Sequence, residues 1–322
     1  MLRTRVTDLL GIQYPITQGG LAHLAFAELA AAVSNAGGLG QITATTLPSA
    51  EALRAQIAQV RSLTDKPFAI NFQIGRRDLS ELVLTAAELE VPTMSFTAGD
   101  PRPYFRLIEG LPIKKLCLVA TTRQARNAED LGADVVIAVG FEGGGHIGRD
   151  DLASLVLVPR VVESVGIPVL ASGGFADGRG LVAALALGAE GIEMGTRFIA
   201  TQECIAHPNY KQALVDADEA DTMVVERSIG RPARVLRTPL AEAILQIEQQ
   251  GGSIEELLPL ISRDMNLLAA YEGDMAGGFV WAGQVVGLMH DVPTVRELME
   301  RIVAEAQTIG QRLCPLLQTI EE

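Results

Sequence analysis

Cysteines and aromatic residues are scarce in this chain, and each shortage excludes a class of protein. Of its 322 residues, three are cysteine and only 4% are aromatic. Cys117, Cys204 and Cys314 are odd in number, widely spaced and form no CxxC pair, so neither a disulfide framework nor a zinc site is expected. No HExxH or grouped-carboxylate pattern occurs, and we therefore expect no bound metal.

Positive charge is also in short supply. The 26 Lys and Arg residues face 39 Asp and Glu residues, which gives a net charge of −13. Because nucleic-acid binding needs Lys and Arg gathered on one face, this balance argues against a nucleic-acid partner. No segment reaches the roughly 18 apolar residues of a membrane helix, and the N-terminal residues hold no apolar run like that of a signal peptide. We expect no membrane partner and a cytoplasmic location.

What the chain does have is an alternation of β-rich runs with helical runs. The runs expected to form strands are mostly rich in Val and Ile or almost continuously apolar, as strands buried on both faces should be. They span residues 14–18, 39–43, 68–73, 93–97, 115–119, 135–139, 169–172 and 191–194. Apolar residues at helical spacing and good caps predict helices over 25–35, 49–63, 80–90, 122–131, 152–165 and 178–187.

Eight strands that alternate with helical runs predict an α/β fold, a closed (β/α)₈ TIM barrel. An open, doubly wound sheet of six strands with a second domain is the alternative. After Met194 the pattern turns helical, with prolines as punctuation and helices expected over 239–249, 254–261 and 294–313. We expect a barrel over 1–215, a helical region over 216–290 that covers the barrel mouth, and a C-terminal helix in 291–322 that packs back on the barrel.

The loops that follow the expected strands are rich in glycine. In a (β/α)₈ barrel these loops form the active site, and those after strands seven and eight commonly hold phosphate. Glycine lets backbone N–H groups approach an anion, and the helix that follows offers its positive N-terminus. Gly173, Gly174, Gly195 and Thr196 are therefore predicted to bind phosphate. Simple tight turns are the alternative.

His146 stands in a glycine-walled loop after the sixth strand. An imidazole there could transfer a proton near pH 7, and a polar residue on an exposed turn is the alternative. Glu142, in the same loop, could be a base or simply a solvated carboxylate. His23 faces the mouth, where local packing or solvation explains it.

Seven motifs occur in the order of a known family: YPITQGG, ELAAAVSNAGGLG, KPFAINF, GGGHIG, VLASGGFADGRG, LGAEGIEMGTRF and AHPNYK. With them the whole chain resembles the nitronate monooxygenase (2-nitropropane dioxygenase-like) family. That family includes flavin-dependent NADH:quinone reductases and flavin-dependent enoyl-acyl-carrier-protein reductases. The GGHIG loop is similar to that of the enoyl reductases, whereas SGGFADGRGLVAALALGA is similar to the quinone reductases.

The resemblance implies a non-covalent FMN over the barrel mouth. Gln18, Gly19 and Gly20 would line the flavin and Asn71 would bond its polar edge. The remaining expected cofactor contacts are Glu142, Gly145, Ser172, Gly173, Gly174, Gly195 and Thr196, and His146 matches the catalytic histidine. Some members carry a Lys near the end of strand five, where this chain reads Cys117-Leu118-Val119.

The resemblance does not fix the reaction, and our first hypothesis is a nitronate monooxygenase. An alkyl nitronate would give one electron to FMN, and O₂ would complete the conversion to a carbonyl compound and nitrite. The alternative is an NAD(P)H-dependent reductase of quinones or enoyl thioesters, and a non-catalytic phosphate-binding barrel is a third reading. The expected partners are a small-molecule substrate, O₂ or NAD(P)H, and a second copy in a homodimer.

Overall fold

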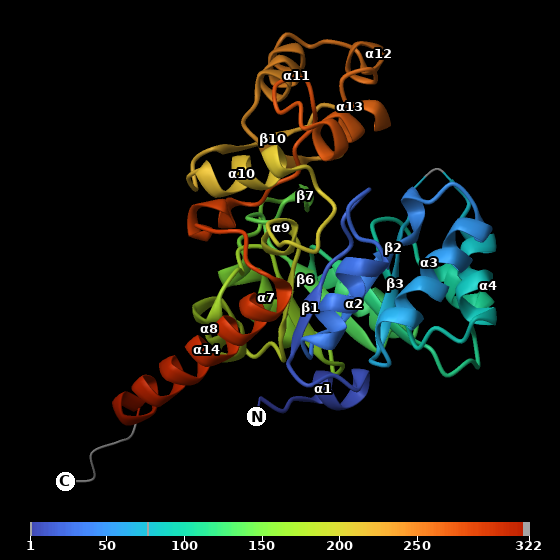
Figure 1. Cartoon of the computed structure of the whole chain (residues 1–322), viewed down its shortest axis with the longest axis vertical. Helices are drawn as coiled ribbons and strands as arrows, with labels where there is room; N and C mark the ends of the chain where they lie inside the picture. The colour runs from blue at the N-terminus through green and yellow to red at the C-terminus, as the bar shows by residue number, and fades with distance from the viewer. Residues whose placement is uncertain (1, 76, 318–322) are drawn as a thin grey trace.

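An eight-stranded parallel sheet forms the centre of the computed structural model, which describes residues 2–75 and 77–317 (Figure 1). Its neighbours run in the order β1-β9-β8-β6-β5-β4-β3-β2. The strands are β1 (Ile16–Gln18), β2 (Gly40–Thr43), β3 (Phe68–Gln73), β4 (Thr93–Thr97), β5 (Lys114–Val119), β6 (Val135–Val139), β8 (Val169–Ser172) and β9 (Ile192–Met194).

Strand β1 closes this sheet into a barrel. On one side it pairs in parallel with β9, Ile16 opposite Ile192. On the other, a parallel bridge joins Thr17 to Leu39, and the Gln18 amide donates to the Leu39 carbonyl at 3.0 Å. The predicted (β/α)₈ barrel is confirmed, and the open sheet is excluded.

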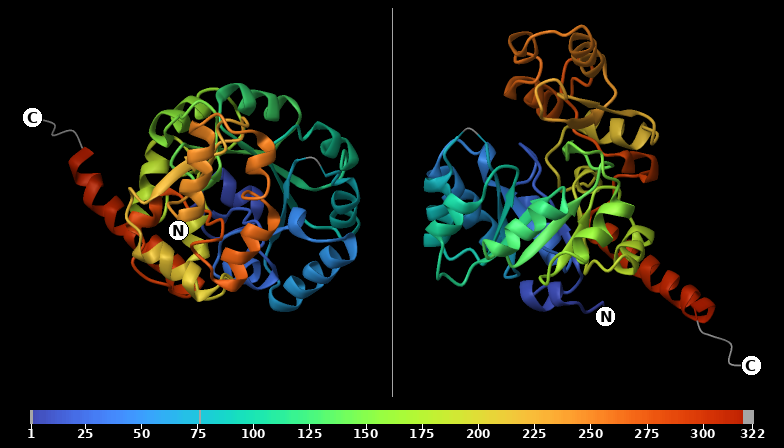
Figure 2. Two further views of the ribbon diagram at one scale, coloured as in Figure 1. Left: turned by 90° about the horizontal axis from the view of Figure 1, so that it is seen from above. Right: turned by 180° about the vertical axis from the view of Figure 1, so that it is seen from behind.

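Helices surround the barrel (Figure 2, left). They are α2 (Ala27–Asn35), α3 (Ala50–Leu63), α4 (Ser80–Glu88), α5 (Arg102–Leu107), α6 (Thr122–Asp130), α7 (Ser154–Val162) and α8 (Gly178–Ala186). Side chains at the N-caps start several of them: Ser49 accepts from the Ala52 amide and Thr121 from the Gln124 amide. Most of these helices lie within a few residues of the predicted ranges, whereas α5 and α1 (Arg5–Leu10) are too short to show a helical period and were not anticipated.

The barrel interior has an apolar layer and a polar layer. Towards the amino ends of the strands, side chains from several strands form one buried cluster with Val6 and Leu10 of α1, which lies across the lower end of the barrel (Figure 1). The strand residues of this cluster include Leu39, Ala69, Leu116, Val135, Ile137 and Leu170. Two residues further along β2 and β3, on the same face of each strand, stand the buried polar residues Gln41 and Asn71. The polar layer thus lies nearer the carboxyl rim.

The segment after the barrel forms a cover over that rim (Figures 1 and 2). The helix expected over 239–249 is present as α11 (Pro239–Gln249), whereas only the first turn of the one expected over 254–261 is an α-helix, α12 (Ile254–Leu257). The segment also holds α10 (Pro208–Asp216), α13 (Arg263–Leu267) and the π-helix η2 (Leu268–Glu272). The structure adds a small antiparallel sheet that the helical expectation did not include. It pairs β10 (Thr222–Val225) with β11 (Ala233–Leu236), and β11 with β7 (Gly145–His146).

The cover has a core of its own, in which β10, β11 and α11 bury side chains such as Val225, Val235 and Ile244. The C-terminal helix α14 (Val295–Leu317) leaves the cover and packs against α8 and α2 of the barrel. The last residues of the expected C-terminal segment, 318–322, lie outside the described part of the chain. Within the described part, no helix is both long and apolar enough to cross a membrane.

Gly40 tests the packing of α2 on the barrel. A Cβ atom at this residue would lie 1.9 Å from the Ala30 carbonyl oxygen, so the backbone of α2 would have to move. We expect Gly40→Ala to lower the free energy of unfolding by about 2 kcal/mol or more, measured by urea denaturation. Gly310→Ala is the matched control, because a Cβ there meets nothing within 4 Å and alanine favours a helix by up to about 1 kcal/mol. Equal effects of the two substitutions would contradict this account.

Candidate functional site

A cavity of about 740 Å³ opens between the carboxyl rim of the barrel and the cover, a size typical of cofactor and ligand sites. Every expected site residue except Gln18 lines it: Gly19, Gly20, Asn71, Glu142, Gly145, His146, Ser172, Gly173, Gly174, Gly195 and Thr196. These residues come from loops after β1, β6, β8 and β9 and from the end of β3. Closure of the barrel therefore brings together residues that are far apart in the sequence.

Gln18 lies inside the barrel wall instead. Its side chain is fully buried; Oε1 accepts a hydrogen bond from the Gln41 amide at 2.9 Å, and Nε2 donates to the Gly19 carbonyl. Both polar ends of this side chain are therefore used to hold β1 and its loop in place. The part of this loop that faces the cavity is Gly19 and Gly20.

A chain of hydrogen bonds crosses the polar layer beneath the cavity. Asn71 Nδ2 donates to Ser95 Oγ at 2.9 Å, Ser95 Oγ donates to Gln41 Oε1, and Gln41 Nε2 donates to Glu193 Oε2 at 3.1 Å. Burial raises the pKa of Glu193 to about 7, against the opposing effect of the bond from Gln41. Glu193 also lines the cavity. Glu193 is not among the residues expected from the sequence, although a lone acid in the apolar strand Ile192–Met194 was a signal.

The glycines after β8 form a turn that only glycine adopts easily. Gly173 and Gly174 have φ values of +80° and +85°. A Cβ on Gly173 would lie 2.8 Å from the Gly140 carbonyl oxygen, and one on Gly144 would lie 2.6 Å from the Gly283 amide. These loops therefore pack backbone against backbone, and Gly173 and Gly174 line the cavity.

The N-terminus of α8 is not available to a phosphate. Asp177 Oδ1 accepts from the Gly180 amide at 3.0 Å, and Glu305 Oε2 of α14 accepts from the Gly178 amide at 2.7 Å. The expectation that the helix after this loop offers its positive end is therefore wrong, because two carboxylates already occupy it. An anion at this site would depend on the loop amides.

Glu142 lines the cavity, but its carboxylate is engaged with α7. Both of its oxygens accept from the Ser154 amide at 3.0 Å, and Oε2 also accepts from Ser154 Oγ at 3.0 Å. Thr196 is likewise engaged, since its Oγ1 accepts from the Gly283 amide at 3.0 Å. Both residues tie the loops of the rim to neighbouring segments.

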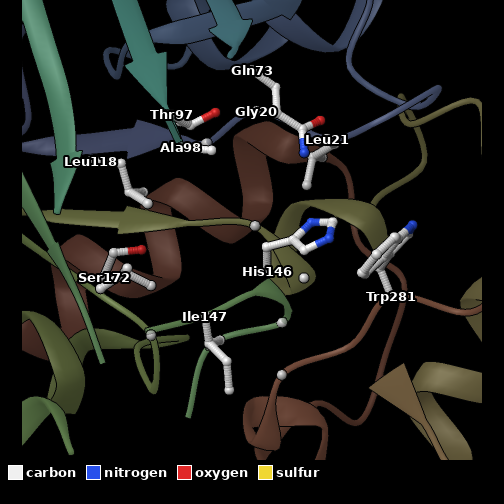
Figure 3. A pocket seen from close by; sticks show the side chains of 18 of the residues that line it. Gly20, Leu21, Gln73, Thr97, Ala98, Leu118, His146, Ile147, Ser172 and Trp281 are labelled. Atoms are coloured by element: carbon white, nitrogen blue, oxygen red, sulfur yellow. The ribbon is translucent and has the colours of Figure 1, made fainter. Parts of the chain in front are cut away.

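His146 faces the cavity from β7, with its ring beside that of Trp281 (Figure 3). The two ring centroids are 5.3 Å apart. His146 Nε2 lies 3.2 Å from Arg231 Nη2 and 3.8 Å from Glu226 Oε2. Trp281, Arg231 and Glu226 are not among the residues expected from the sequence, because they come from the cover, more than 70 residues further along the chain.

Two other residues reach the cavity from the barrel. His23 has a φ of +63°, and burial, followed by the charge of Arg263, lowers its pKa. From β5, Leu118 lines the cavity, whereas Cys117 is buried in the core and burial raises its thiol pKa to about 12. The strand-five side chain that faces the cavity is thus apolar.

Charged side chains of both signs line the cavity, and Glu142, Asp150, Glu193 and Glu226 are the acidic ones. Three arginines stand among them. Arg123 of α6, Arg149 after β7 and Arg231 before β11 all line the cavity. In the described residues, no group of three or more His, Cys, Asp or Glu is placed to hold a metal ion.

A closed (β/α)₈ barrel with a covered, glycine-walled cavity of cofactor size is the architecture of a cofactor-dependent barrel enzyme. The family model for nitronate monooxygenase matches residues 3–88 and 70–305. The chain belongs to the nitronate monooxygenase family, whose members are flavin-dependent oxidoreductases, and the protein is an oxidoreductase.

Three relatives show the range of this family. The structure of FabK from Thermotoga maritima is 42% identical and superposes with a TM-score of 0.91, covering 98% of this chain and 100% of its own. A probable nitronate monooxygenase of Staphylococcus saprophyticus is 34% identical, over 97% of this chain and 99% of the relative. A (3aS,4S,5R,7aS)-5-hydroxy-7a-methyl-1-oxo-octahydro-1H-indene-4-carboxyl-CoA dehydrogenase of Rhodococcus jostii is 33% identical, over 95% of this chain and 96% of the relative.

The raised pKa of Glu193 makes a prediction about stability. Between pH 4.5 and 7 the buried carboxyl keeps its proton while the unfolded chain loses it, so stability falls as pH rises through this window. Glu193→Gln removes this dependence. The free energy of unfolding is measured by urea denaturation for both proteins at pH 4.5 and at pH 8. We expect the difference, variant minus parent, to increase by about 3 kcal/mol from the lower to the higher pH. A difference between the two proteins that does not change with pH would contradict the assignment.

Proposed function

We propose that this chain is an FMN-dependent oxidoreductase in which His146 acts as an acid/base. The observation that carries the proposal is the convergence, in one cavity, of the glycine wall, Asn71 and His146. The walls also suit a flat ligand at close range: a Cβ on Gly20 would lie only 2.1 Å from Asn71 Oδ1, so the loop backbone approaches the polar layer without an intervening side chain.

Each part of the cavity suits one part of FMN. Ser172, Gly173, Gly174, Gly195 and Thr196 would hold the phosphate through their loops. Gly19, Gly20 and Asn71 would lie against the polar edge of the flavin ring. When bound, FMN supplies the one- and two-electron redox chemistry that amino-acid side chains lack.

The protein contributes proton transfer and exclusion of water. His146, whose Nε2 lies beside Arg231 and Glu226, would exchange a proton with the substrate through its imidazole. Trp281 covers one side of that ring. The cover would keep bulk water from the reacting atoms, since it lies directly over the carboxyl rim.

Reduction of an enoyl thioester by NAD(P)H is the reaction that we favour. FabK, an enoyl-acyl-carrier-protein reductase, shares 42% of its residues with this chain, and the Rhodococcus relative is named for a CoA thioester. Arg123, Arg149 and Arg231 at the mouth suit the phosphates that CoA, phosphopantetheine and nicotinamide dinucleotides carry. In this reaction His146 would protonate the carbon next to the thioester carbonyl.

Oxidation of an alkyl nitronate with O₂ is the second candidate. It is supported by the family model and by the staphylococcal relatives named as probable nitronate monooxygenases. A nitronate, like the enolate of a thioester, is a carbanion stabilised by a neighbouring polar group, so His146 would face the charged group of either ligand. Reduction of a quinone would use the same cavity.

We also propose that the chain consists of three regions with different roles. Residues 1–215 would bind FMN, 216–290 would cover the site and contact the substrate, and 291–322 would brace the barrel from outside. The core within the cover and the packing of α14 on α8 support this division. A homodimer stays a prediction.

Anaerobic mixing separates the two reactions. We expect NADH or NADPH to bleach the flavin absorbance of the purified protein within a turnover time, and crotonyl-CoA to restore it, because hydride passes from nicotinamide to thioester through one cavity. A separate sample receives a propyl nitronate. Bleaching by the nitronate together with indifference to both nicotinamides would replace our first candidate by the second. A colourless protein that takes up no added FMN would overturn both.

His146→Ala tests the acid/base role. We expect the variant to retain FMN, because the phosphate and ring contacts come from other loops, while turnover falls by a factor of about 10²–10⁴. His290→Ala is the matched control, since His290 is exposed and lies outside the cavity. Flavin content is read from the visible spectrum and turnover from NAD(P)H consumption. Loss of flavin from the His146 variant would instead give this residue a structural role.

A further inference from the structure

We propose that Glu226 and Arg231, on the loop between β10 and β11, form a pair of positioning residues that sets the protonation state of His146. This inference rests on the proposed acid/base role of His146 and adds to it the part of the cover that controls it. Neither residue belongs to the barrel or to any of the seven motifs that carry the family resemblance.

Glu226 is a buried carboxylate without a hydrogen bond for one of its oxygens. The residue is only 2% exposed, and in the described parts of the chain no donor lies within hydrogen-bonding reach of its Oε2. That oxygen lies 3.8 Å from His146 Nε2 and 4.0 Å from Arg231 Nε. Leaving a buried carboxylate oxygen unpaired costs free energy, so its retention beside the imidazole points to a role there.

The backbone holds Glu226 in an unusual conformation for this task. Its φ of +62° is in the left-handed region that residues with a Cβ rarely adopt. Its amide donates to Glu248 Oε2 of α11 at 2.9 Å, and its carbonyl accepts from the Arg231 amide at 3.0 Å. Beyond this turn, Ala233 of β11 pairs with His146 of β7. The loop is therefore anchored both to α11 and to the strand that carries the histidine.

The pair gives Nε2 two alternative partners. When His146 is neutral with its proton on Nδ1, the Nε2 lone pair accepts from Arg231 Nη2 at 3.2 Å. When Nε2 is protonated, it becomes a donor that faces Glu226 Oε2. Arg231, whose side chain is exposed, must then turn away from the ring, and Glu226 balances the positive charge. Arg231 thus favours the neutral ring and Glu226 the charged one.

The other groups near this ring are unchanged by either substitution. Trp281 approaches from the cover and carries no charge. On the segment that carries His146, Arg149 and Asp150 follow the histidine, and Glu142 precedes it. Arg123 lines the same cavity from α6. A comparison of variants at residues 226 and 231 therefore isolates their effect on His146.

The test follows the His146 ring by NMR in the FMN-loaded protein and in the flavin-free protein, with labelled histidine. His146→Gln identifies the signal. We expect Glu226→Gln to move the titration midpoint of this signal to lower pH by about one unit, and Arg231→Met to move it in the opposite direction. Glu242→Gln is the matched control, because Glu242 is an exposed carboxylate of the cover outside the cavity; we expect no shift in this variant.

The pH profile of kcat/KM should move in the same direction as the midpoint in each variant. Midpoints that stay within 0.2 units of the parent in both the Glu226 and Arg231 variants would overturn the inference, even if the enzyme is active. If Glu226→Gln does not fold, Arg231→Met alone tests the inference, since the Arg231 side chain is exposed and its replacement is not expected to prevent folding. If the midpoints shift as expected but neither a nicotinamide nor a nitronate reduces the flavin, the roles of Glu226 and Arg231 are supported and the proposed function is overturned.

Discussion

Closure of the barrel through β1 is the constraint on which the rest of this structure depends. Because β1 pairs with β9 on one side and meets β2 on the other, all eight strands point the same way around a closed ring. Their carboxyl ends must then share one rim. Loops separated by more than 100 residues, such as those of Gly20 and Gly173, thereby form a single cavity.

The division of the barrel interior follows from the same closure. Side chains that alternate along each strand fill the lower part with apolar residues, which stabilise the barrel, and place polar residues beneath the cavity. Glu193 shows that the second layer is costly, since burial disfavours its charged form. The hydrogen bonds from Asn71 through Ser95 and Gln41 offset part of this cost and hold the layer rigid under the ligand.

His146 connects the barrel to the cover. It stands in a loop of the barrel, yet its strand β7 is completed by β11, and the groups that contact its ring come from the cover. Any motion of the β10–β11 loop would therefore change the surroundings of the imidazole together with access to the cavity. One segment of the cover therefore borders both the cavity and the imidazole.

The sequence by itself determined the barrel and most of the cavity wall, because buried parallel strands leave continuous Val- and Ile-rich runs and the loops of the rim are rich in glycine. It also placed His146 at the rim. Only the tertiary structure decided that the Gln18 side chain is hydrogen-bonded inside the barrel wall and that Glu305 of α14 accepts from an amide at the N-terminus of α8. The same holds for the position of Glu226 and Arg231 beside His146. The reason is physical: periodicity and turn chemistry record interactions between near neighbours, whereas a contact between distant segments leaves no pattern in either one alone.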